Sequence, residues 1–106
     1  MTNEQRQQVK KALWNYGILQ RFESEENRHW CDAIQETIDY YKDRDPIREG
    51  LLQIRYLEHT TEEKTLDKLH IGRTTYQKAQ LDLLSTLAVF AARRGQIGRA
   101  SCRERV

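Results

Sequence analysis

Residues 61–84 read TEEKTLDKLHIGRTTYQKAQLDLL. The pattern predicts a short helix from about residue 61 or 62 to 69, a tight turn at 69–72, and a longer helix over about 73–92. A short helix, a turn and a long helix in this order form the helix-turn-helix pattern. The second half of the chain is therefore predicted to contain a helix-turn-helix.

Apolar residues in the same stretch predict how the two helices pack. Leu66 and Leu69 are expected to anchor the first helix to a core, and Ile71 to fill the inside of the turn. Tyr76 and Ala79 are expected to seat the second helix, with the small Ala79 side chain at the steep crossing of the two helices.

This packing leaves a polar flank exposed at the start of the second helix, the part of a recognition helix that enters the major groove. Arg and Lys can donate to guanine or phosphate, Gln can pair with adenine, and Thr offers a hydroxyl and a methyl group. The predicted base-proximal residues are Arg73, Thr74, Thr75, Gln77 and Lys78. The predicted phosphate contacts from the first helix are Thr61, Lys64, Thr65 and Lys68.

The rest of the chain predicts three more helices. The first spans about Asn3–Phe22, with Thr2 and Gln5 as a capping box and Gly17 as a point where the helix could bend or break. The second spans about 25–42, where apolar residues recur along one face. These residues are Trp30, Ala33, Ile34, Thr37, Ile38 and Tyr41.

The third of these helices spans about Pro46–Glu58 and follows Asp45 as its cap. Thr60 with Glu63 has the spacing of a capping box for the helix after it. The sequence therefore predicts an all-α fold of about five helices. It divides into an N-terminal helical pair at 1–44, a dimerisation or partner-binding element, and a helix-turn-helix DNA-binding unit at 45–95.

The last ten residues, 97–106, follow a helix stop and lack apolar periodicity. They resemble the in-frame translation of a common sequencing adapter, so we interpret 96–106 as a cloning or sequencing-adapter scar rather than a natural basic tail.

Without residues 97–106, Lys+Arg falls from 18 to 15, Asp+Glu from 16 to 15, and the net charge from +2 to zero. Only the local charge then bears on DNA binding. Residues 65–94 carry five basic and two acidic side chains, a net +3 that suits a phosphate-facing surface.

Composition and motifs argue against other classes of protein. Five Gly and one Pro in 106 residues make a sheet fold improbable. Cys31 and Cys102 lack metal-ligand spacing with each other and with the histidines, so we expect no metal and no cofactor. No phosphate loop or nucleophile motif points to an enzyme. The absence of a long apolar run predicts no membrane association and a cytoplasmic location; the resemblance described next implies that the host is bacterial.

The segment from about Asp45 to Ala92 resembles the small phage transcriptional regulators of the RinA and ArpU type. The resemblance rests on LHIGRTTYQKA at 69–79 and on LLQIRYL at 51–57. These regulators are similar in turn to region 4 of bacterial sigma factors, which has a helix-turn-helix. The resemblance implies a phage or prophage regulator that activates late or lysis genes and binds double-stranded DNA. Gly72 departs from the Ser that is usual in the family, which weakens the cap of the recognition helix.

Two points stay open at this stage. RNA polymerase and a second copy of the chain are further candidate partners. The alternative function is a helical protein-interaction module that docks on RNA polymerase or a phage protein through the apolar face of residues 25–42, without reading DNA.

Overall fold

The computed structural model describes residues 2–22 and 24–95, and within these ranges the chain is all-helical. The predicted all-α fold is therefore confirmed. The elements in chain order are α1 (Asn3–Trp14), α2 (Tyr16–Arg21), α3 (Glu25–Lys42), α4 (Pro46–Leu51), the π-helix η1 (Leu52–Leu57), α5 (Glu62–Leu69) and α6 (Arg73–Arg93). The segment 96–106, interpreted above as a scar, lies outside the described residues.

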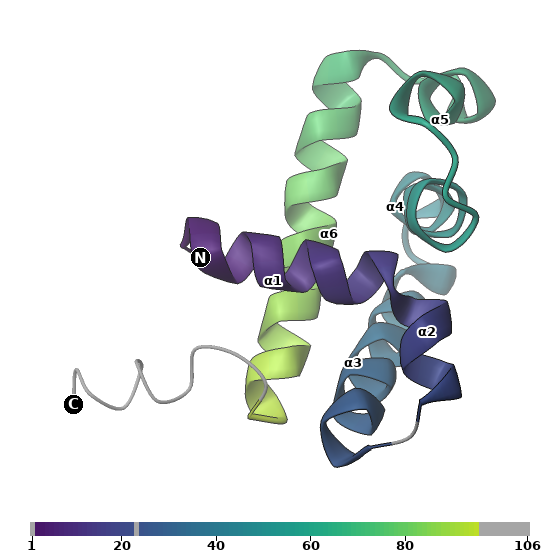
Figure 1. Ribbon diagram of the computed structural model, residues 1–106. Helices are drawn as coiled ribbons and strands as arrows, with labels where there is room; N and C mark the ends of the chain where they lie inside the picture. The colour runs from purple at the N-terminus through teal and green to yellow at the C-terminus, as the bar shows by residue number, and fades with distance from the viewer. Residues whose placement is uncertain (1, 23, 96–106) are drawn as a thin grey trace.

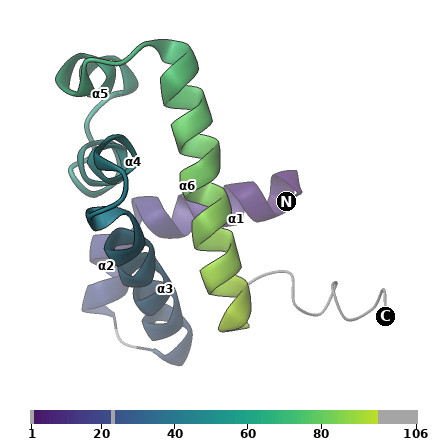
Figure 2. The same ribbon diagram turned by 180° about the vertical axis from the view of Figure 1, so that it is seen from behind.

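The long helix α6 is the axis on which the other elements are arranged. It contacts α1, α3 and α4, while α5 packs on α4 and η1. Figure 1 shows α1 crossing in front of α6, and α5 beside the upper, N-terminal end of α6. Seen from behind in Figure 2, α1 passes behind α6, so α1 covers only one side of the long helix. The first turns of α6 thus extend past the crossing with α1.

The buried apolar side chains form one core drawn from both halves of the chain. The core cluster runs from Val9 on α1 to Ala91 on α6 and includes side chains from α3, α4 and η1. The segments 1–44 and 45–95 therefore share a single core. Each buries its apolar face against the other, so experiments on this protein need the whole chain.

Helix α3 begins and ends where the sequence predicts, at Glu25 and Lys42. Ser24 caps it by accepting a hydrogen bond from the amide of Asn27 at 3.0 Å. All six residues of its apolar face are buried, facing α2 and α6. The alternative function required this face to be exposed for a partner. The prediction that a partner docks there is wrong, because the face is buried in the core of the same chain.

The first predicted helix is two helices, α1 and α2, which meet at Asn15 rather than at Gly17. The capping box of Thr2 and Gln5 is confirmed. At the break, Nε2 of His59 lies 2.8 Å from the carbonyl oxygen of Trp14, the last residue of α1. A side chain that engages a helical carbonyl interrupts the ladder of backbone hydrogen bonds.

The predicted helix at Pro46–Glu58 changes type halfway. It is α-helical to Leu51 and continues as the π-helix η1, where the amide of Glu58 donates to the carbonyl of Gln53, five residues back. The wider turn changes which side chains point inward. Tyr56 is buried, whereas Ile54 is only half-buried.

Candidate nucleic-acid interface

The turn between α5 and α6 is closed by hydrogen bonds of the backbone alone. His70 adopts the left-handed conformation, with φ 55° and ψ 46°. Its amide donates to the carbonyl of Asp67 at 3.3 Å, and the amide of Ile71 donates to that of Leu66 at 3.1 Å. This pair of bonds is a Schellman motif, which ends a helix and turns the chain. The predicted bend at 69–72 is therefore present.

Helix α5 begins one residue later than the capping box at Thr60 and Glu63 predicted. Thr61 is the cap, and its hydroxyl accepts a hydrogen bond from the amide of Lys64 at 3.3 Å. Leu69 at the other end packs closely on α4. A Cβ on Gly50 would lie 2.6 Å from a methyl carbon of Leu69, so glycine permits this approach.

One predicted phosphate contact is wrong. Thr65 has 0% exposure, and its hydroxyl donates to the carbonyl of Thr61 at 2.7 Å. Its side chain faces inward because it lies on the same side of α5 as the half-buried Leu66 and Leu69. The other three residues of that set, Thr61, Lys64 and Lys68, are exposed.

The predicted base-proximal residues share one exposed flank. We call Arg73, Thr74, Thr75, Gln77 and Lys78 the α6 flank, and all five are exposed. Tyr76, in the middle of the flank, is 1% exposed and points into the core, as does Ala79. At 3.6 residues per turn, Thr74 and Lys78 project from the side of the helix opposite to Tyr76. The flank lies on the end of α6 that extends past α1 (Figure 1).

Arg73 already has a partner in the free protein. Its Nη1 lies 2.8 Å from Oε2 of Glu62 at the start of α5, and 62% of its side chain is exposed. Exposed ion pairs of this kind contribute about 0–1 kcal/mol. The pair therefore ties the two helices weakly, and a stronger anion would compete for the guanidinium at little cost.

Two side-chain hydrogen bonds hold the buried side of α6 against η1. Nε of Arg55 donates to the hydroxyl of Tyr76 at 3.1 Å, and Nε2 of Gln80 donates to the hydroxyl of Tyr56 at 2.6 Å. Burial raises the pKa of Tyr56 above its usual value, so its hydroxyl stays neutral. The sequence analysis missed Arg55 and Gln80, because an arginine and a glutamine on helices carry no signal that they point inward.

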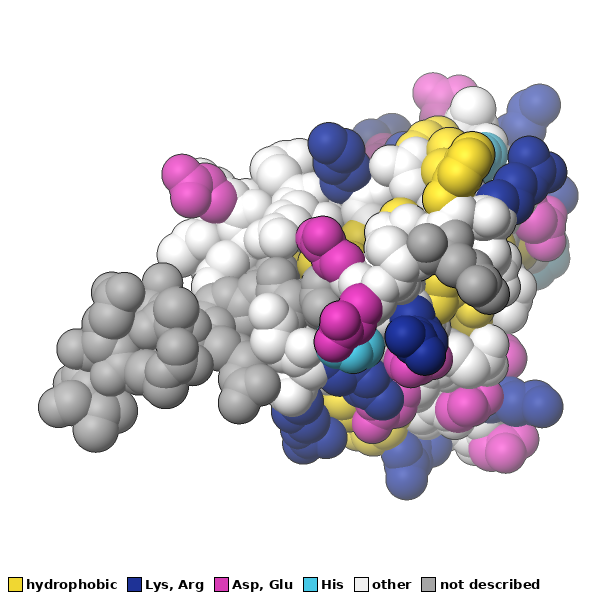
Figure 3. Space-filling model, turned by 60° about the horizontal axis from the view of Figure 1, so that its bottom comes forward, with side chains coloured by type: hydrophobic (Ala, Val, Ile, Leu, Met, Phe, Trp, Pro, Cys, Tyr) yellow, Lys and Arg dark blue, Asp and Glu magenta, His cyan; other side chains and the backbone are white. Residues whose placement is uncertain are grey.

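The charges around the flank are mixed. Lys64 and Lys68 are exposed on α5, but Glu62, Glu63 and Asp67 lie on the same helix. Figure 3 views the molecule from the bottom of Figure 1, the side away from the flank, and on that face too Lys and Arg alternate with Asp and Glu without an area of one sign. The positive charge available to phosphates is therefore local and modest.

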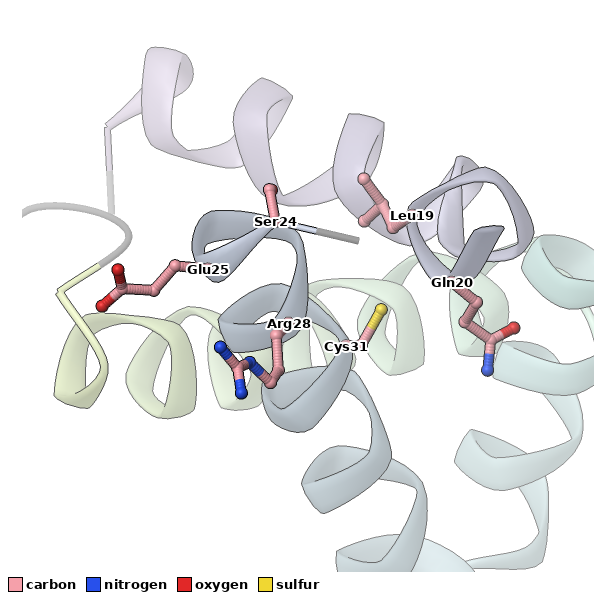
Figure 4. Close-up of a pocket in the computed structure, with 6 residues that line it drawn as sticks. All are labelled: Leu19, Gln20, Ser24, Glu25, Arg28 and Cys31. Atoms are coloured by element: carbon pink, nitrogen blue, oxygen red, sulfur yellow. The ribbon is translucent and has the colours of Figure 1, made fainter. Parts of the chain in front are cut away.

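A hollow of about 550 Å³ lies between α2 and α3, away from the flank (Figure 4). Its lining includes Leu19, Gln20 and Cys31, and burial raises the pKa of the Cys31 thiol, which favours the unreactive neutral form. Glu25 and Arg28 extend away from that thiol in Figure 4.

Among residues 2–22 and 24–95, no three His, Cys, Asp or Glu side chains gather as metal ligands. The described helices also include none with the length and apolar character needed to cross a bilayer.

The local geometry thus consists of a short helix, a closed turn and a long helix. The polar flank of the long helix is exposed, and its buried side is hydrogen-bonded to η1. Of the nine predicted site residues, the structure exposes all but Thr65. Comparison of the chain with protein-family models, curated proteins and solved structures finds no match.

Proposed function

We propose that this protein binds duplex DNA in a sequence-specific manner, with the α6 flank in the major groove. The observation that carries the proposal is the exposure of this flank on an end of α6 that extends past α1, next to a turn closed by a Schellman motif. A major groove about 12 Å wide admits one α-helix. The uncovered turns of α6 meet that requirement.

Three side chains of the flank and two lysines of α5 have roles that follow from their chemistry. The Gln77 amide can make a paired hydrogen bond with adenine, and Lys78 can donate to guanine or to a phosphate. Arg73 would exchange Glu62 for a phosphate or a base edge. Lys64 and Lys68 on α5 would contact the phosphates and set the orientation on the duplex.

The biological setting of the proposal comes from the resemblance of residues 45–92 to phage regulators of the RinA and ArpU type. A regulator of that type would act on late or lysis genes of a phage or prophage in the bacterial cytoplasm. Activation would then follow from contact with RNA polymerase beside the bound site.

Salt dependence of binding tests the proposal. With about four phosphate contacts, the slope of log K against log salt is about −3.5, a loss of roughly 100-fold between about 50 and 200 mM salt. The probe is a pool of random duplexes about 30 base pairs long, which is three helical turns. The selected duplex is then compared with a scrambled one.

Matched lysine variants locate the contact. Lys78→Ala should weaken binding and make the salt slope shallower by about one contact. Lys42→Ala, also an exposed lysine but at the end of α3, should leave both unchanged. Absence of duplex binding by the whole chain, or equal effects of the two variants, would contradict the proposal.

A second candidate function also has an observation behind it. Trp14, Ile18 and Phe22 on α1, α2 and the residue after α2 are 38%, 53% and 66% exposed. These side chains, rather than the face of α3, are the apolar surface that a protein partner such as RNA polymerase could bind. Phe22→Ser should reduce binding to purified polymerase and leave duplex affinity unchanged. Loss of polymerase binding together with a flat salt slope would favour this function over DNA recognition.

A further inference from the structure

One guanidinium group connects most of the elements that surround the start of α6. Arg55 lies on η1, and its Nε donates to the hydroxyl of Tyr76 while its Nη1 donates to the carbonyl of Thr60, both at 3.1 Å. Its guanidinium carbon lies 5.2 Å from the centre of the Trp14 ring and 5.9 Å from that of Tyr56. Arg55 therefore contacts α1, η1, the segment before α5, and α6.

We infer that Arg55 is a positioning residue for the α6 flank, which it holds through Tyr76 without itself touching DNA. The inference rests on the proposed function for its DNA readout. Tyr76 stands between Thr75 and Gln77 in the sequence, two residues of the flank, and its own side chain is buried. A bond to its hydroxyl thus restrains the rotation and the axial position of the first two turns of α6.

The start of α6 needs such a restraint because its own cap is weak. Gly72 occupies the cap position and makes no side-chain hydrogen bond to the helix. The first four amides of any helix lack partners within that helix, so an uncapped start frays. At Thr61, by contrast, the cap of α5 is made by its own side chain.

Arg55 lies in the irregular part of the backbone, the π-helix η1. From this wider turn, two neighbouring side chains form hydrogen bonds with α6: Arg55 bonds to Tyr76, and the buried Tyr56 bonds to Gln80. The carbonyl of Thr60, which Arg55 also engages, leads directly to the cap of α5. The two helices of the helix-turn-helix are thereby held by the same side chain.

The chain offers a matched pair of tyrosines for the test. Tyr76→Phe removes the hydroxyl that Arg55 holds and keeps the buried ring. Tyr56→Phe removes the hydroxyl that Gln80 holds, which is also a bond between η1 and α6, but one that lies beyond the flank. Both variants lose one hydrogen bond at a buried ring, and Tyr76→Phe is expected to lower the stability of the fold somewhat more, because the partner of Tyr76 is charged and that of Tyr56 is neutral.

Tyr76→Phe should lower affinity for the selected duplex by about tenfold, which corresponds to one charge-assisted hydrogen bond. The salt slope should stay as in the wild-type chain, because no phosphate contact is removed. Tyr56→Phe should leave affinity unchanged. Arg55→Lys, which keeps the charge but loses the planar fork, should resemble Tyr76→Phe.

Hydrogen exchange in the free protein gives a readout that does not depend on DNA. The amides of 77–79 should exchange about tenfold faster in Tyr76→Phe than in Tyr56→Phe. Equal exchange rates, or equal loss of duplex affinity in the two variants, would reduce Arg55 to a stabilising contact and overturn the inference. If the wild-type chain binds no duplex, the proposed function fails, and the exchange rates alone decide whether Arg55 positions α6.

Discussion

Histidines in the left-handed conformation precede and follow α5, and different forces hold them there. His59, with φ 58°, stacks on Trp14 with ring centres 4.1 Å apart, and its Nε2 contacts the carbonyl of the same tryptophan. His70, with φ 55°, sits in a Schellman motif made by its own backbone and that of Ile71. Left-handed conformations cost a non-glycine residue about 1–2 kcal/mol.

The difference separates a tertiary turn from a local one. At His59 the side chain provides contacts with α1 that offset the backbone strain. At His70 the described part of the chain shows no side-chain hydrogen bond, ion pair or ring contact, so the strain is offset by the turn itself. The turn before α5 also has a backbone bond, from the amide of Thr60 to the carbonyl of Ile54 at 3.1 Å. It should therefore depend in part on distant residues, and the turn after α5 should not.

Removal of the tryptophan should have the largest effect on the turn at His59. Trp14→Ala removes the ring that stacks on His59 and lies near Arg55. Burial of a tryptophan contributes about 3–5 kcal/mol, and this ring is 38% exposed, so we expect a loss of about 2 kcal/mol in the free energy of unfolding. Urea denaturation followed by circular dichroism measures it. An effect below about 0.5 kcal/mol would show that the ring does not support the turn.

Substitution of each histidine by glycine should change the stability of the protein in opposite directions. His70→Gly relieves backbone strain without loss of a side-chain contact and should stabilise the protein by up to about 1 kcal/mol. His59→Gly relieves the same strain but loses the stack and the hydrogen bond, with a net destabilisation of about 1 kcal/mol. In the Trp14→Ala background the cost of His59→Gly should fall to about zero, because the stack is already absent and only the hydrogen bond to the backbone carbonyl of residue 14 is lost. Thermal unfolding of the four variants completes the cycle, and equal effects at the two histidines would refute the distinction.

The start of α4 adds another locally determined turn, with a pH dependence. Burial raises the pKa of Asp45, but hydrogen bonds and charge from Arg48 outweigh it and lower that pKa below its usual value. A carboxylate whose pKa is lower in the folded protein stabilises it above the unfolded pKa, and this stabilisation is lost as the pH falls through the folded value. Asp45→Asn keeps the cap and loses the ion pair, at a cost of about 0.5 kcal/mol at pH 7. The difference between wild type and variant should begin to shrink as the pH falls below about 4, the usual pKa of an aspartate, and should vanish once the pH lies below the lowered pKa of Asp45; a difference that persists in stronger acid would exclude the ion pair as its cause.

The smallest effect is expected at the cap of α6. Gly72→Ser supplies a hydroxyl for the free amides at the start of the helix and should stabilise it by a few tenths of a kcal/mol, about 0.3. If Arg55 already restrains this end, the gain in duplex affinity should be larger in the Arg55→Lys background than in the wild-type chain. A gain of equal size in both would argue that cap and guanidinium act independently.

The parts of the fold that the sequence predicted are those with local causes. The bounds of α3 follow from Ser24, the apolar repeat and the stop after Lys42, all within one segment. The start of α6 at Arg73 follows from the turn residues beside it. Thr65 was misplaced because Thr on a short helix has no preference for either side, and packing on neighbouring elements decided which side is buried.

The candidate site divides in the same way. Exposure of the α6 flank could be read from the spacing of Tyr76 and Ala79, because helical periodicity determines which side of a helix faces a core. The support behind the flank could not be read. It depends on the π-helical turn that brings Arg55 to Tyr76, and a turn of that kind arises from contacts among several elements.

By itself, the amino-acid sequence determined the helical fold, the turn at His70 and the outward side of α6. Each of these depends on residues within a few positions of one another, whose backbone bonds and spacing act locally. Tertiary structure decided the exact place of the break, at Asn15 rather than Gly17, together with the π-helix and the burial of Thr65. These depend on contacts between residues far apart in the chain, such as His59 with Trp14, whose energies enter only when the helices meet.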